Sequence, residues 1–186
     1  GHKDSKYLMQ LSSLFQINNF DILRIHPIDH GDTEHLNKDF FRATDIQTLI
    51  EAVEFIGKKY QDNEIHLIGF SLGGNIALRI SACKSINFLK STVVISPVID
   101  PEISMRAMDN TSWILKKYFV NKWRRTLRRK MRLHNISNVE ESLRYKDLEK
   151  MTEFFTKNFS PHKNVKELFA GYAITQDTIN QIKNNT

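Results

Sequence analysis

The chain has 186 residues, of which 40% are hydrophobic, and this is enough for one ordinary domain with a substantial core. No apolar run approaches the roughly 20 residues of a membrane-spanning helix, and a single cysteine, Cys83, excludes an internal disulfide. A buried thiol suits a reducing compartment, so we expect a cytoplasmic protein. The net charge of +6 is concentrated between Trp113 and Leu133, where nine Lys and Arg residues occur without an acid, so the rest of the chain is net negative.

The first hundred residues alternate between helix and strand patterns. Apolar residues at helical spacing predict helices over residues 7–15 and 46–56. Short, apolar runs predict strands over residues 20–26, 64–70 and 91–96. Alternation of this kind indicates a parallel α/β sheet that is covered by helices.

After Asp100-Pro101 the strand signal stops and the remaining patterns are helical. Apolar residues recur every four positions from Phe119 to Met131, and a second helical pattern runs from Leu148 to Phe155. A helical insertion after a sheet predicts a cap, which would exclude water from a site and shape an acyl pocket. We expect an α/β core over residues 1–100, a helical cap over residues 101–174 and a return segment over residues 175–186.

The most informative stretch is Glu64–Cys83, where a strand pattern runs into G-F-S-L-G-G and then into a helix pattern. Strand, glycine-flanked serine and helix together are typical of a nucleophile elbow rather than of an ordinary Gly-Ser turn. Such a turn would hold the Ser71 hydroxyl above the sheet, near the positive end of the following helix. The N–H of Leu72 would then point at the oxygen that becomes negative when Ser71 attacks a carbonyl. The glycines that permit this turn are predicted to be Gly69, Gly73 and Gly74.

Segments along most of the chain carry a family resemblance. They are D-S-K-Y (Asp4–Tyr7), D-H-G-D (Asp29–Asp32), L-N-K-D-F-F (Leu36–Phe41), G-F-S-L-G-G-N (Gly69–Asn75), S-P-V-I-D-P (Ser96–Pro101), K-W-R-R-T-L-R-R-K (Lys122–Lys130) and M-T-E-F-F (Met151–Phe155). With them the chain resembles the α/β-hydrolase fold and, within it, the bacterial YheT-like serine hydrolases, relatives of monoacylglycerol-lipase-type esterases. It departs from that family at Ile28, where an Arg often precedes D-H-G, and at Phe41-Arg42-Ala43, where the family has F-H-S.

The resemblance also implies an internal piece of a longer hydrolase, with a partial α/β-hydrolase fold. In this family the oxyanion loop follows a strand that ends in His-Gly, which would make the His2 N–H the second oxyanion donor. The triad acid and histidine come after strands that follow the cap, so we expect them beyond residue 186. One strand of the fold would lie between residues 20–26 and 64–70, so these two segments should be one strand's width apart or paired directly.

A triad inside the chain is the alternative. Asp100 follows the strand after the elbow, where some α/β-hydrolases carry their acid, and His134 and His162 lie downstream in the right order. Both histidines fall in the helical insertion, with no strand ahead of them to aim the ring at Ser71. This arrangement favours a triad that is completed outside the chain.

Two further segments could bind ligands. His30, Asp32 and His35 form H-x-D-x-x-H, but no third histidine or thiolate cluster supports a zinc site, which favours a polar loop at the rim of the active site. Aromatic residues lie between the charged residues of the basic segment. This pattern is found in segments that bind nucleic acid or an anionic membrane surface. Its apolar stripe favours instead a cap helix with buried apolar side chains and solvated arginines.

The sequence therefore predicts a serine hydrolase that cleaves carboxylic or lipid acyl esters through an acyl-enzyme, without a cofactor or metal. An acyltransferase would use the same serine, and a non-catalytic module with a basic cap is the alternative from a different functional class. The expected partner is a small acyl-ester substrate and not nucleic acid, while peripheral contact with anionic lipid stays open.

Overall fold

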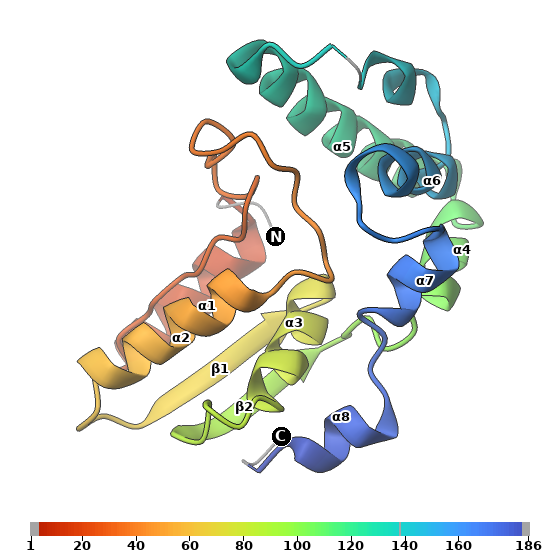
Figure 1. The fold of residues 1–186 in the computed structure, drawn as a ribbon. Helices are drawn as coiled ribbons and strands as arrows, with labels where there is room; N and C mark the ends of the chain where they lie inside the picture. Colours follow the sequence, from red (N-terminus) through yellow and green to blue (C-terminus); the bar gives the residue numbers. More distant parts are fainter. Residues whose placement is uncertain (1–3, 138, 184–186) are drawn as a thin grey trace.

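The computed structural model describes residues 4–137 and 139–183. Its core contains two parallel strands, β1 (Ile65–Phe70) and β2 (Leu89–Ile95), which are joined through helix α3 (Leu72–Ser81) (Figure 1). Parallel strands need a crossover of this kind, because the chain must return to the same end of the sheet before it enters the next strand. The predicted class, a parallel sheet flanked by helices, is confirmed.

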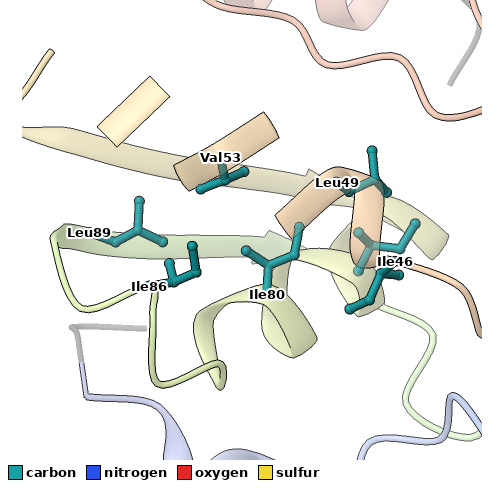
Figure 2. Close-up of a cluster of buried hydrophobic side chains, with 7 residues drawn as sticks. Ile46, Leu49, Val53, Ile80, Ile86 and Leu89 are labelled. Carbon is teal, nitrogen blue, oxygen red and sulfur yellow. The ribbon is translucent and has the colours of Figure 1, made fainter. Parts of the chain in front are cut away.

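One face of the strands is covered by α3 and by α2 (Gln47–Lys59), which was predicted as the second helix. Side chains alternate between the two faces of a strand, and those on this face join the apolar stripes of both helices in one buried cluster (Figure 2). Burial of one large aliphatic side chain contributes about 1.5–3 kcal/mol, so this cluster fixes the position of α3 on the sheet. Its members are Ile46, Leu49, Val53, Ile76, Ile80, Ile86 and Leu89.

The opposite face is contacted by α1 (Lys6–Ile17), the first predicted helix, which begins after the N-cap residue Ser5 and ends before Asn18. The ring of Tyr7 in α1 lies 5.0 Å, centroid to centroid, from the ring of Phe70 at the end of β1. No residue of α1 is fully buried, so the helix rests on the sheet through only part of its apolar stripe.

The predicted strand over residues 20–26 is wrong. Residues 20–27 have no regular secondary structure, and within the described part of the chain β1 pairs only with β2, so direct pairing of this segment with β1 is also wrong. An apolar pattern gives a strand its buried face, but the strand also needs a neighbour whose N–H and C=O groups complete a ladder. Here the segment contributes side chains instead: the Phe20 ring packs edge-on against His66 of β1, with 6.1 Å between centroids.

Everything described after Asp100 is helical or irregular, as predicted, and we call residues 101–181 the helical region. Figure 1 shows it beside the strands and α3. A second buried cluster, formed by Val120, Leu127, Leu148 and Met151, holds its two longest helices together. The elements are α4 (Pro101–Asp109), α5 (Trp113–His134), a 3-10 helix (Glu140–Arg144), α6 (Leu148–Phe159), α7 (Val165–Ala170) and α8 (Gln176–Gln181).

The expectation of solvated arginines holds for Arg125, Arg128 and Arg132, which are exposed, whereas the side chain of Lys130 is completely buried. Lys116, Arg124 and Arg129 also bind carboxylates or carbonyl groups of the protein. The apolar stripe of α5 is buried or half-buried as predicted. In the described residues, no helix is both long enough and apolar enough to cross a membrane.

Candidate active site

Ser71 stands between the end of β1 and the start of α3 in a strained backbone conformation, with φ 52° and ψ −122°. A positive φ of this kind costs a non-glycine residue about 1–3 kcal/mol and persists only when the surroundings enforce it. Here the Ser71 N–H donates to the carbonyl of Ile95 at 3.0 Å, and the Ser71 carbonyl accepts from the N–H groups of Gly74 at 2.9 Å and Val98 at 3.3 Å. Hydrogen bonds from both sides of the turn therefore hold the serine in this conformation.

Two of the three glycines around Ser71 are explained by close contacts. A Cβ atom at Gly69 would lie only 2.3 Å from the carbonyl oxygen of Gly73, and one at Gly74 would lie 3.0 Å from the Cβ of Pro97. A Cβ at Gly73 would meet no atom within 4 Å, so the structure gives no steric reason for glycine at that position. The first turn of α3 thus packs directly against the end of β1, which is possible only because Gly69 lacks a side chain.

Ser71 and Leu72, the predicted nucleophile and oxyanion donor, lie together at one end of the sheet. Ser71 is exposed at the carboxyl end of β1, where ligands bind in open α/β sheets. Leu72 is the first residue of α3, so its N–H belongs to the group of first-turn donors that have no acceptor within the helix. The helix dipole adds partial positive charge at the same end. The other predicted oxyanion donor, His2, lies outside the described residues.

Asn75, to which sequence reasoning assigned no role, fastens the elbow to two distant segments. Its side chain is completely buried, and Nδ2 donates to the carbonyl of Val98 at 2.8 Å and to that of Tyr172 at 2.6 Å. Val98 follows β2, and Tyr172 lies between α7 and α8 in the helical region. An amide within an otherwise apolar, buried helix face was the sequence signal that could have revealed this contact.

The residues of the alternative triad are engaged elsewhere. Asp100 caps α4, because its Oδ1 accepts from the N–H of Ile103 at 2.9 Å. His134 Nε2 lies 2.7 Å from the carbonyl oxygen of Glu34 and therefore donates to it. His162 Nε2 lies 3.4 Å from the hydroxyl of Thr44. Among the hydrogen bonds of residues 4–137 and 139–183, none joins Asp100 or either histidine to Ser71.

The H-x-D-x-x-H segment does not converge on a metal-sized site. His30 Nδ1 donates to the Ile28 carbonyl at 2.8 Å, Asp32 binds Arg129 at 2.7 Å, and His35 Nδ1 donates to the Asp32 carbonyl at 3.0 Å. Burial lowers the pKa of His30, although its hydrogen bond to Ile28 opposes that shift. In the part of the chain that the structure describes, no group of three His, Cys, Asp or Glu residues is arranged to hold a metal ion.

The D-H-G-D loop is instead tied to α5. The Lys130 ammonium lies 2.5 Å from Asp29 Oδ1, donates to the carbonyl of Asp39 and sits 5.0 Å from the centre of the Phe40 ring. Asp29 Oδ2 accepts the N–H of Phe41 at 2.9 Å, which closes the loop on itself. A buried ion pair therefore connects the loop that follows residues 20–27 to the longest helix of the helical region.

Comparison with known proteins agrees with this architecture. A protein-family profile described as an alpha/beta hydrolase fold matches residues 4–181, a range that includes both the elbow and the helical region. No match is found among curated proteins or among solved structures. A profile match of this extent supports a hydrolase-type activity in general. The chain belongs to the α/β-hydrolase fold family.

Proposed function

We propose that the protein is a serine hydrolase of carboxylic or lipid acyl esters, with Ser71 as its nucleophile. The observation that carries this proposal is the strained backbone of an exposed serine at φ 52° and ψ −122°, between a parallel strand and the helix that follows it. An ordinary Gly-Ser turn has no need of such strain, whereas a nucleophile must be held above the end of the sheet with its oxygen free to attack.

The reaction proceeds in two steps. Ser71 Oγ attacks the ester carbonyl carbon while its proton passes to a general base, and the N–H of Leu72, together with that of His2, stabilises the negative oxygen. The base then protonates the departing alcohol, and water, activated by the same base, releases the acid from the acyl-enzyme. We place the histidine and acid of the triad outside residues 1–186, because Asp100 and His134 already bind backbone groups elsewhere.

In this proposal residues 101–174 form a cap over the active site, residues 1–100 are the catalytic core, and residues 175–186 return toward that core. Asn75 supports that assignment, because it bonds the first turn of the nucleophile helix to Tyr172 in the helical region. A cap held in this way would limit the access of water to the acyl-enzyme and shape the acyl pocket.

The test is covalent labelling of the full-length protein with a fluorophosphonate, combined with hydrolysis of a p-nitrophenyl ester. We expect the probe on Ser71, and we expect the Ser71→Ala variant to lose both labelling and several orders of magnitude of hydrolysis while its circular dichroism spectrum is unchanged. Ser85→Ala, which alters an exposed serine in the turn before β2, is the matched control and should retain both signals. Near-normal hydrolysis by Ser71→Ala would rule the proposal out.

If labelling succeeds but added alcohols accept the acyl group in preference to water, the enzyme is an acyltransferase. Both activities form the same acyl-enzyme on Ser71 and differ only in the acceptor that resolves it. Measuring free acid and new ester in the same reaction separates them.

A further inference from the structure

One face of α5 remains exposed along the whole helix. The buried side of the helix is marked by Val120, Leu127 and Lys130, which point into the fold. The residues on the opposite side, at helical spacing, are all exposed. They are Ile114, Lys117, Tyr118, Asn121, Lys122, Arg125, Arg128 and Arg132. This outward face carries no acidic residue, because none occurs between Trp113 and Leu133.

The outward face has two chemically different parts. Its first turns present two large apolar side chains: Ile114 is 61% exposed and Tyr118 is 56% exposed, and the neighbouring first residue of the helix, Trp113, is 70% exposed. From Lys122 onward the face is a cationic stripe of Lys122, Arg125, Arg128 and Arg132. Large apolar side chains exposed this close together, with Leu115 among them at 49%, are typical of surfaces that bind a partner.

The cations of the stripe differ from the other cations of the same helix. Lys116, Arg129 and Lys130 form ion pairs with carboxylates of the protein. Among residues 4–137 and 139–183, no ion pair joins any cation of the stripe to a carboxylate. The inward cations of α5 thus contribute to the fold, and the charge of the stripe is left for an external anion.

We propose that this face of α5 docks on an anionic lipid surface, with the stripe against the phosphate head groups and the apolar first turns inserted at the head-group boundary. Charge complementarity supports the first contact, because each Lys or Arg near an anionic membrane adds to binding. Tryptophan and tyrosine are the side chains that favour the interface between hydrocarbon and water. Exposed aliphatic side chains, here Ile114 and the half-exposed Leu115, favour lipid over nucleic acid, since they cannot stack on bases as aromatic rings do.

Docking of α5 is independent of the chemistry proposed for Ser71 and goes beyond it. The surface lies on the helical region and includes no residue of the elbow. If both proposals hold, docking brings the enzyme to the surface that holds lipid esters. If only docking holds, the protein is a peripheral lipid-binding module, and Ser71→Ala should bind vesicles as well as the unmodified protein does.

The test is co-sedimentation of the full-length protein with vesicles of phosphatidylcholine alone or mixed with phosphatidylserine. We expect binding to the mixed vesicles that weakens as salt is raised, because salt screens exposed charges. The triple variant Arg125→Gln/Arg128→Gln/Arg132→Gln should bind on the order of a hundredfold more weakly, from the contribution of three cations at an anionic surface. The matched control Lys58→Gln/Lys84→Gln/Lys157→Gln removes the same charge from other exposed positions and should bind nearly as well as the unmodified protein.

The apolar part is tested separately with Trp113→Ala/Ile114→Ala, which leaves the charge unchanged and should bind the mixed vesicles severalfold more weakly. Three results would each overturn the proposal. They are an absence of binding to mixed vesicles, equal losses in the stripe and control triple variants, and tighter binding to a duplex DNA oligonucleotide than to the vesicles at the same salt concentration.

Discussion

The buried ion pair between Lys130 and Asp29 offers the sharpest test of how the helical region is attached to the core. The Lys130 side chain is 0% exposed and that of Asp29 is 6% exposed, with 2.5 Å between Nζ and Oδ1. In a Lys130→Met variant the aliphatic stem is retained and the charge is lost. Within the described residues, the buried Asp29 carboxylate would then keep only the Phe41 N–H as a hydrogen-bond partner. Leaving one charge of a buried pair without its partner costs about 3–5 kcal/mol of stability.

For a chain of this length, a loss of 1 kcal/mol lowers the melting temperature by about 2–4 °C, so we expect Lys130→Met to melt roughly 6 to 20 °C lower. Urea unfolding followed by circular dichroism would give the change in free energy directly. Lys122→Met, an exposed position on the same helix, is the control and should change stability by less than about 0.5 kcal/mol.

A double-mutant cycle separates the ion pair from simple loss of packing. Asp29→Asn alone should also destabilise, because it leaves the Lys130 ammonium buried without its carboxylate. The double variant Lys130→Met/Asp29→Asn removes both charges and should lose clearly less than the sum of the two single losses. Additivity of the two losses within about 0.5 kcal/mol would refute the reasoning, as would a Lys130→Met variant as stable as the Lys122→Met control.

Three further results are expected. Gly69→Ala should cost about 1–3 kcal/mol in urea unfolding, because its Cβ would lie 2.3 Å from the Gly73 carbonyl oxygen, whereas Gly73→Ala, whose Cβ meets open space, should not destabilise. Burial lowers the pKa of His30 below 6.5 in the folded protein, so the unfolded chain takes up the proton first as pH falls. The free energy of unfolding should therefore decline below about pH 6.5, and His30→Gln should flatten that decline; equal slopes would exclude this role for His30. Partial burial also raises the pKa of the Cys83 thiol, so iodoacetamide at neutral pH should modify it more slowly than a free cysteine, and equal rates would contradict that shift.

The parts of the fold that could be predicted from sequence are those whose cause is local. The elbow depends on residues within Gly69–Asn75 and on the strand and helix that flank them, so its pattern was visible in one short stretch. Helices α5 and α6 were visible for the same reason, because an apolar stripe is set by residues three and four positions apart. The oxyanion and triad assignments stay predictions. His2 lies outside the described residues, and no hydrogen bond among the described residues joins a candidate triad residue to Ser71.

The parts that could not be predicted depend on contacts between distant residues. The pattern of residues 20–26 satisfied the local requirement of a strand, but pairing needs a second strand, which no local pattern can supply. Lys130 follows a run of basic residues and gave no sign that it alone is buried beside Asp29, roughly a hundred positions earlier in the chain. A basic residue on a helix can be predicted to point inward only when the carboxylate that it binds is known, and here that carboxylate lies far away in the sequence.

Contacts between residues far apart in the sequence use polar side chains here, because backbone carbonyl groups in irregular segments need hydrogen-bond donors. Segments without regular structure cannot satisfy their own backbone carbonyl groups when they are buried, so a donor must come from another element. Helices α3 and α5 provide such donors, each from a side chain that reaches a carbonyl in an irregular segment. The pairs are Asn75 with Val98 and Tyr172, Arg79 with Ala43 and Thr44, Arg124 with Tyr145, Lys130 with Asp39, and His134 with Glu34.

The two helices therefore organise the irregular segments around them in addition to burying their own apolar stripes. For α3 this has a direct consequence at the candidate active site, because Asn75 lies in the same turn whose N–H groups bond the Ser71 carbonyl. The strain at Ser71 is sustained by backbone bonds to Ile95 and Val98, and Asn75 holds the Val98 segment in place. One amide side chain thus bonds both the Val98 segment that supports the serine and the carbonyl of Tyr172 in the helical region.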